Sequence, residues 1–456
     1  MGEIQVKTKT GIVRGGRKIE HVVFRGIPYG KAPAGSLRWK RPLPFETWEG
    51  IREARVFANR PFAGGFIPGT FYGKEFGIDE DFLPPMSEDC LFLNIWAPAK
   101  TLDVKDANDI QFPRGEKLPV AFWIHGGGFV NGHATEQEFD GEAFAKQGVI
   151  LVTVGHRVGS FGYLAHPWFS KEGGDGSGNY GLYDLIAALD WVYENISAFG
   201  GDPEKISVFG QSAGAISVQA LISTKLTRGK IKGAVIQSAG GYNPSVTRFR
   251  PFEEAEKIGK DFSDFCGVNS LEAFRAIPGE KLVELQSAFL KEWAKTHTGR
   301  GPFGPNQDGL LLEDTEYRLL ENGLHHDIPY MIGCTANDIG FNRDQAKPGE
   351  RPPLYQVCTD FSLLNEKLGR HPAWVYYFTH EPQGDNAGAF HSAELWYVFG
   401  TLSRSWRPKS PADYALSDRI VSYWCNFFKS GNPNSPELPP WKPHGAGDPF
   451  VMELHG

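Results

Sequence analysis

The stretch Ile206-Ser207-Val208-Phe209-Gly210-Gln211-Ser212-Ala213-Gly214-Ala215 decides how this chain folds. An apolar, partly β-branched run ends at Phe209, Gly-x-Ser-x-Gly follows, and a helix-forming run extends to Leu221. Strand, sharp turn and helix in this order are the context of a nucleophile elbow, whose strained turn lifts a serine hydroxyl clear of the sheet. A glycine-rich turn that happens to hold a serine is the alternative. The rest of the chain must therefore supply an oxyanion hole, an acid and a histidine.

The composition is that of an ordinary globular protein. The chain has 456 residues, of which 41% are hydrophobic and 22% charged, enough for two domains or for one large α/β domain. The net charge is −7 and no long basic run occurs, which argues against a nucleic-acid partner. The longest apolar runs, such as 149–154, are far too short to span a bilayer.

The five cysteines are widely spaced, and no Cys-x-x-Cys occurs. This pattern argues against a zinc site or a disulfide framework. Free buried thiols favour a reducing compartment, so we expect a cytoplasmic protein. The N-terminus shows no signal-peptide pattern; a secreted protein whose signal peptide has been removed is the alternative.

Hydrophobic patterning predicts a mostly parallel sheet flanked by helices. Residues 4–25 alternate as in short antiparallel strands, and 60–86 lack a clear period, which predicts a long surface loop. Continuous apolar runs predict strands that are covered on both faces, and segments of helical period between them argue an α/β fold. The expected strands are 90–96, 118–124, 149–154, 233–237, 327–333 and 373–378, and the clearest helices are 182–196 and 410–430. No interdomain linker is visible, so we expect one domain over 1–456.

A second glycine-rich turn follows the apolar strand that ends at Ile124. His125-Gly126-Gly127-Gly128-Phe129 can expose consecutive backbone N–H groups. Together with the N–H of Ala213, the N–H groups of Gly127 and Gly128 can hold the negative oxygen of a tetrahedral intermediate. A flexible glycine turn is the alternative.

The acid and the histidine should follow the serine in that order. Of thirteen histidines, His391 lies in a loop that leads into an apolar helix, whereas His325 and His326 have the pattern of surface residues. Asp338 follows a predicted strand and is the preferred acid. Asp308 and Asp344 are its rivals.

These residues together resemble the type-B carboxylesterase family, which includes the cholinesterases. The likeness extends over nearly the whole chain, and the GQSAG form of the elbow is most similar to that of bacterial carboxylesterases. The segments that carry it are 10–15, Phe24-Arg25-Gly26-Ile27-Pro28-Tyr29, Leu37-Arg38-Trp39, Ser87-Glu88-Asp89-Cys90-Leu91-Phe92-Leu93-Asn94, 178–184, 195–203 and 391–400.

The resemblance implies an α/β-hydrolase fold and a serine esterase that needs no metal or cofactor. It places the nucleophile at Ser212, the base at His391 and the acid, usually a glutamate, at Asp338. It also implies oxyanion donors at Gly127, Gly128 and Ala213, supporting residues at Gln211, Ser238 and Glu394, and two structural ion pairs, Arg38–Glu88 and Arg157–Asp184. The expected partner is a small-molecule ester, with a monomer or dimer as the assembly.

Three departures from the family pattern affect the site. The family's early disulfide uses the cysteine at Cys90, but no cysteine precedes it here, so the loop from Arg60 to Glu88 must be held otherwise or be mobile. The choline-binding tryptophan would fall at about Glu80, which argues against a cation–π choline site. The segment between Asp338 and His391 is short. We therefore expect excursions at about 60–88 and 242–305, a shortened cap at about 342–372, and an open site.

The substrate is less well determined than the reaction. Aromatic residues that could line an acyl or aryl pocket are Phe289, Trp293, Phe303 and Trp396, with ordinary packing as the alternative for each. We expect activity on short-chain or aryl esters. The alternatives are a catalytically inactive cholinesterase-like binding protein, and an amidase or transacylase on the same fold.

Overall fold

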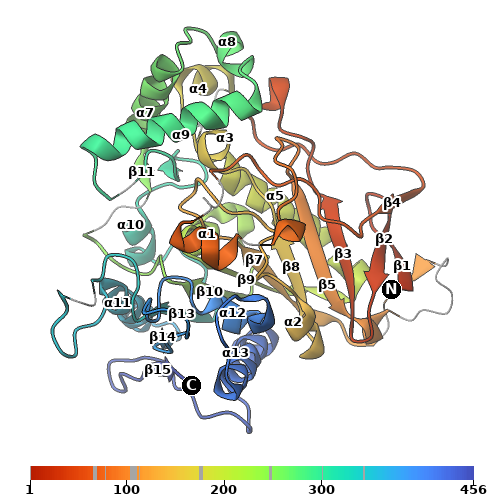
Figure 1. Cartoon of the computed structure of the whole chain (residues 1–456), viewed down its shortest axis with the longest axis vertical. Coiled ribbons are helices and arrows are strands. Elements are labelled where there is room, and N and C mark those ends of the chain that lie inside the picture. Colours follow the sequence, from red (N-terminus) through yellow and green to blue (C-terminus); the bar gives the residue numbers. More distant parts are fainter. Residues whose placement is uncertain are drawn as a thin grey trace.

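A large twisted sheet forms the centre of the molecule (Figure 1). The computed structural model describes residues 2–64, 69–77, 79–102, 110–111, 113, 115–173, 178–245, 249–299, 301–342 and 345–456. Among these residues, no helix is long and apolar enough to cross a membrane.

The sheet joins a parallel half to an antiparallel N-terminal half. In the order of their hydrogen bonding, its strands are β15 (Met452–Leu454), β14 (Trp374–Phe378), β13 (Tyr330–Thr335), β10 (Gly233–Gln237), β9 (Gly201–Gln211), β7 (Leu118–Ile124), β8 (Ile150–Val154), β5 (Phe92–Pro98), β3 (His21–Pro28), β2 (Ile12–Arg17), β1 (Gly2–Lys7) and β6 (Ile110–Gln111), with β4 (Ile51–Glu53) also paired to β2. The strands from β15 to β8 run parallel, and β8, β5, β3, β2 and β1 pair antiparallel. The expected fold class is confirmed.

Helices cover both faces of the sheet. They are α1 (Phe71–Phe76), α2 (Glu142–Lys146), α3 (Gly159–Gly162), α4 (Pro167–Gly173), α5 (Tyr180–Asn195), α6 (Ala213–Ser223), α7 (Phe252–Phe265), α8 (Leu271–Arg275), α9 (Gly279–Thr296), α10 (Glu316–Glu321), α11 (Pro353–Lys367), α12 (Leu395–Val398) and α13 (Pro411–Ser430). Helices α7, α8 and α9 lie together at the top of Figure 1, far from α13 at the bottom.

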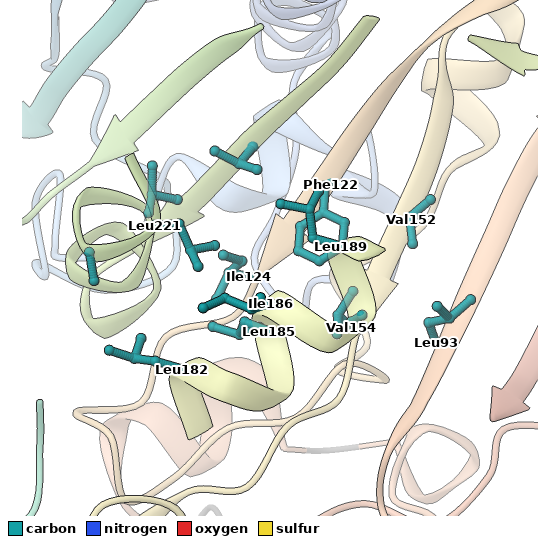
Figure 2. Close-up of a cluster of buried hydrophobic side chains, with 14 of the residues drawn as sticks. Leu93, Phe122, Ile124, Val152, Val154, Leu182, Leu185, Ile186, Leu189 and Leu221 are labelled. Carbon is teal, nitrogen blue, oxygen red and sulfur yellow. The ribbon is translucent and has the colours of Figure 1, made fainter. Parts of the chain in front are cut away.

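Strand β7 shows how its side chains divide the core. Successive side chains of a strand point to opposite faces, so Phe122 and Ile124 pack in the cluster that contains α5, whereas Trp123 packs in the cluster that contains α13. Figure 2 shows the first cluster, with the leucines of α5 against β7 and β8. Burial on both faces explains why the central strands are apolar throughout.

Two expectations are wrong, the surface position of His325 and His326 and the surface loop at 60–86, and in both segments polar side chains are buried. His325 and His326 are not at the surface: they are 2% and 6% exposed, and the side chain of His325 is bonded to Asn365 and Arg370. The described part of 60–86 is more than a surface loop, since it contains α1, in which Glu75 and Phe76 are buried. Strand and helix ends elsewhere differ from the expected bounds by up to three residues, as at β13 and α5.

Candidate active site

Ser212 lies at the turn between β9 and α6. Its backbone has φ 57° and ψ −124°, a conformation that a non-glycine residue adopts only when its surroundings impose it. The N–H of Ser212 donates to the carbonyl of Gln237 on β10 at 2.9 Å. The elbow is therefore held against the neighbouring strand.

Two glycines allow the close approach of backbone that this turn requires. A Cβ on Gly214 would lie 2.1 Å from the carbonyl oxygen of Ile124, and a Cβ on Gly126 would lie 3.2 Å from Cβ of Ser212. A Cβ at Gly214 would clash with the carbonyl, and one at Gly126 would crowd Ser212, so glycine is favoured at both positions. The second glycine turn therefore lies directly against Ser212.

The turn after β7 has the conformation expected of an oxyanion loop. Gly127, Gly128 and Phe129 have φ of 110°, 62° and 65°, and the carbonyl of Gly127 accepts from the N–H groups of Val130 and Asn131. Within the described residues, the N–H groups of Gly127, Gly128 and Ala213 have no acceptor. These donors remain available to a ligand beside Ser212.

His391 and Asp338 meet as the sequence predicted. His391 Nδ1 donates to Asp338 Oδ1 at 2.6 Å, and the carboxylate also accepts from the N–H groups of Ile339 at 2.8 Å and Thr335 at 3.0 Å. Burial would raise the pKa of Asp338, but the hydrogen bond and charge of His391 and the Thr335 N–H outweigh it and hold this pKa below its usual value. Asp338 is therefore an ionised acceptor, which fixes the proton of His391 on Nδ1.

The Nε2 atom of His391 faces Gln211. The Gln211 side-chain amide lies 3.2 Å from Nε2, and since Nδ1 carries the proton, the amide donates to the Nε2 lone pair. Within the described residues, no hydrogen bond joins Ser212 Oγ to His391. Catalytic contacts are often long in unliganded enzymes and tighten when substrate binds.

Glu394 and Ser238, which the resemblance implied as supporting residues, lie at the same edge of the sheet. Glu394 is 1% exposed and accepts from Gln237 Nε2 at 3.4 Å. Burial and the charge of Asp338 raise its pKa to about 7. Ser238 follows β10 with φ 55°, and its N–H donates to Gly333 of β13 at 2.8 Å.

The rival acids do not occupy this position. Asp308 Oδ1 accepts from the N–H groups of residues 310–312 and so closes its own loop. Asp344 lies outside the described residues.

Comparisons with known proteins identify the family of the chain. The model of the carboxylesterase family matches residues 2–353 and 353–455. The chain belongs to the carboxylesterase family. It is 31% identical to the para-nitrobenzyl esterase of Bacillus subtilis (strain 168), over 94% of this chain and 90% of the relative. It is 30% identical to the fumonisin B1 esterase of Sphingopyxis macrogoltabida, over 95% and 83%.

A solved thermophilic PNB esterase superposes on this carboxylesterase with a TM-score of 0.82 at 30% identity, covering 99% of this chain and 96% of that chain. The protein therefore has the α/β-hydrolase fold and acts on carboxylic esters. Both ion pairs that the resemblance implied are present: Arg38 contacts Glu88 at 2.5 Å and Arg157 contacts Asp184 at 2.6 Å.

Two residues beside the site in this carboxylesterase escaped the sequence analysis. Tyr72 on α1 donates from Oη to the backbone carbonyl of His391 at 3.3 Å, and Glu75 on α1 is 1% exposed and binds Arg407. The segment around Tyr72 and Glu75 has no hydrophobic periodicity. The only signal in its sequence is a glutamate that stands among aromatic residues.

The aromatic residues proposed as pocket walls mostly pack in the core. Phe289 and Phe303 contact Phe262 with ring centroids 5.2 and 5.4 Å apart, and Trp396 is fully buried. Trp293 stacks on His297 at 3.6 Å.

Proposed function

We propose that Ser212 is the nucleophile, His391 the general base and Asp338 the acid of this carboxylesterase. The 2.6 Å contact between His391 Nδ1 and Asp338 carries the proposal, because it holds the proton on Nδ1 and leaves Nε2 unprotonated on the side that faces the elbow. Nε2 can then accept the proton of Ser212 once the Gln211 amide, which contacts it in this structure, gives way. His391 takes the proton from Ser212 as Oγ attacks the ester carbonyl, and the carboxylate stabilises the imidazolium.

The backbone donors of Gly127, Gly128 and Ala213 hold the oxyanion of the tetrahedral intermediate. Collapse of the intermediate releases the alcohol, which His391 protonates. Water then attacks the acyl-enzyme with His391 again acting as base. Gln211 supports this arrangement through its contact with His391 Nε2, and Ser238 and Glu394 support it from neighbouring positions.

We propose short-chain acyl and aryl esters as the substrates. The names of two relatives support an aryl or small ester, since one is a para-nitrobenzyl esterase and another a phenmedipham hydrolase. A panel of p-nitrophenyl esters from acetyl to palmitoyl tests this directly. Higher kcat/KM for the long-chain esters would contradict it.

For the remaining properties, we propose a monomer or dimer in a reducing, cytoplasmic setting. The five free cysteines support the compartment.

Replacement of the serine tests the central assignment. Ser212→Ala should abolish hydrolysis of p-nitrophenyl acetate and butyrate while the circular dichroism spectrum stays unchanged. The wild-type protein should gain one fluorophosphonate adduct, on the peptide that contains Ser212. Near wild-type turnover by Ser212→Ala would refute the assignment, and amide turnover that equals ester turnover would favour an amidase.

A further inference from the structure

Helix α1 contacts the segment that carries His391 through Tyr72. The buried carboxylate of Glu75, on the same helix, binds side chains that follow His391 in the sequence. Figure 1 shows α1 and α12 in the same part of the molecule. Glu75 Oε1 accepts from Trp396 Nε1 at 2.9 Å, and Oε2 accepts from Trp406 Nε1 and Arg407 Nε, each at 2.9 Å. The side chains of Glu75 and Arg407 are 1% and 0% exposed. Charge-assisted hydrogen bonds in such surroundings are strong and fix geometry.

Arg407 extends the network from Glu75 to the residue before the histidine. Its guanidinium lies 4.9 Å from the ring centroid of Phe390 and 5.9 Å from that of Phe71 on α1. The two rings also meet edge to face at 4.9 Å. Phe76, at the other end of α1, stacks on Trp396 at 5.6 Å. We call Glu75, Arg407, Trp396 and Trp406 the Glu75 hub.

The hub matters because α1 cannot hold its place alone. A helix of six residues is far too short to be stable in water, so its position depends on these tertiary contacts. Tyr72, on the same helix, donates a hydrogen bond to the backbone carbonyl of His391 at 3.3 Å.

The backbone next to His391 needs such support. Ser392 has φ 79°, a strained conformation that persists only where its surroundings determine it. Asn337 holds one side of the segment, since its N–H donates to Ala389 and its side chain accepts from the N–H of that residue. Helix α1 holds the other side through Phe71 and Tyr72.

We propose that Glu75 and Tyr72 are positioning residues of the esterase reaction: the hub fixes α1, and α1 fixes the backbone of His391 so that its imidazole meets Ser212. This proposal rests on the role of His391 given under Proposed function.

The test separates positioning from stability. Glu75→Gln keeps the shape of the side chain but removes its charge and places an NH₂ group against a donor, either Trp396 or the pair Trp406 and Arg407. At a temperature where circular dichroism shows the variant folded, we expect kcat for p-nitrophenyl acetate to fall about 10- to 100-fold, with KM changed less than twofold. Glu292→Gln, which removes an exposed ion pair with Lys295 on α9, is the matched control and should leave kcat unchanged.

A double-mutant cycle shows whether the effect passes through α1. Tyr72→Phe alone should lower kcat several-fold and should have no further effect in the Glu75→Gln background. A Glu75→Gln variant with a lower melting temperature but wild-type kcat would overturn the proposal, as would additive effects in the cycle. If Glu75→Gln does not fold, Tyr72→Phe decides alone: wild-type kcat would overturn the proposal, and a several-fold fall would sustain it.

Ser212→Ala, measured in parallel, keeps the two proposals apart. Activity in Ser212→Ala would remove the proposed function itself. Inactive Ser212→Ala together with wild-type kcat in Glu75→Gln and Tyr72→Phe would refute only the positioning role.

Discussion

Replacing Asp338 by asparagine tests how the acid works, because the carboxylate is surrounded only by donors. Oδ1 faces His391 Nδ1 at 2.6 Å and the N–H of Ile339 at 2.8 Å, and Oδ2 faces the N–H of Thr335 at 3.0 Å. An asparagine must direct its NH₂ group at one of these sets. Both orientations also remove the negative charge.

The two orientations have different consequences for Asp338→Asn. If the NH₂ group faces Thr335, one hydrogen bond is lost, which costs about 1–3 kcal/mol of stability, and the imidazolium loses a neighbouring charge that is typically worth about 1–3 pKa units. If the NH₂ group faces His391, it donates to Nδ1, and the imidazole proton moves to Nε2. His391 can then no longer act as a base, which lowers kcat by a factor of about 10⁴. We therefore expect kcat to fall between about 10² and 10⁴, or roughly 2.7–5.5 kcal/mol in the barrier.

The assay is hydrolysis of p-nitrophenyl butyrate at pH 7, with thermal unfolding measured on the same sample. Asp308→Asn is the matched control, since Asp308 binds only the backbone of its own loop and its replacement should leave kcat unchanged. A folded Asp338→Asn protein with kcat within tenfold of the wild type would refute the assignment of the acid. A large loss of kcat in Asp308→Asn would move the assignment there.

Three further predictions follow from single contacts. In Gln211→Glu, a carboxylate would lie near His391 Nε2 and raise the pKa of the imidazole. The acidic limb of the kcat/KM pH profile should therefore move to higher pH by about one unit or more. An unmoved acidic limb would show that the two side chains do not interact. Burial lowers the pKa of His156 to about 4, so its neutral form stabilises the fold above pH 6.5, and this stabilisation is lost as the pH falls from 6.5 toward 4, by about 2 kcal/mol at pH 5. His156→Phe should therefore reduce the difference in urea unfolding free energy between pH 7 and pH 5 by about the same amount. An equal difference in the variant and the wild type would contradict the argument. Gly214→Ala would place a Cβ 2.1 Å from the last carbonyl of β7 and should destabilise the protein by at least about 2 kcal/mol, whereas Gly447→Ala, with open space around its Cβ position, should be neutral in thermal unfolding.

The strands of the parallel half of the sheet were predictable because each of them is marked by a continuous apolar run in the sequence. A strand such as 118–124 is buried on both faces, so its apolar run marks its ends almost to the residue. The serine, the acid and the histidine follow β9, β13 and β14 in turn. Because these strands are parallel, their carboxyl ends lie at the same edge of the sheet, which brings the three residues together. Asp338 and His391 could therefore be named before their contact was seen.

Other features depend on contacts between residues far apart in the chain, which no local pattern reveals. His325 follows a helix end and precedes a second histidine in the sequence, yet its ring is buried and Nε2 contacts Asn365 and Arg370. The segment around Glu75 is equally unmarked, because its partners lie more than 300 residues later. A buried glutamate can be recognised only when its donors are known.

No cysteine precedes Cys90, and the ends of the loop from Arg60 to Glu88 are joined by backbone hydrogen bonds instead: the Arg60 N–H donates to Pro85 at 3.0 Å and its carbonyl accepts from Ser87 at 2.9 Å. Glu75 anchors the middle of the loop to the segment after His391. A disulfide acts mainly on the unfolded chain, by restricting it wherever the loop closes. The Glu75 carboxylate acts only in the folded state, and its partners Trp396 and Arg407 belong to the segment that follows His391. A cross-link near Cys90 would close the loop without directing α1 at the histidine. The Glu75 carboxylate joins α1 to the segment after His391, and Tyr72 on the same helix contacts the His391 backbone. One buried side chain of the loop therefore sets the geometry of the proposed base.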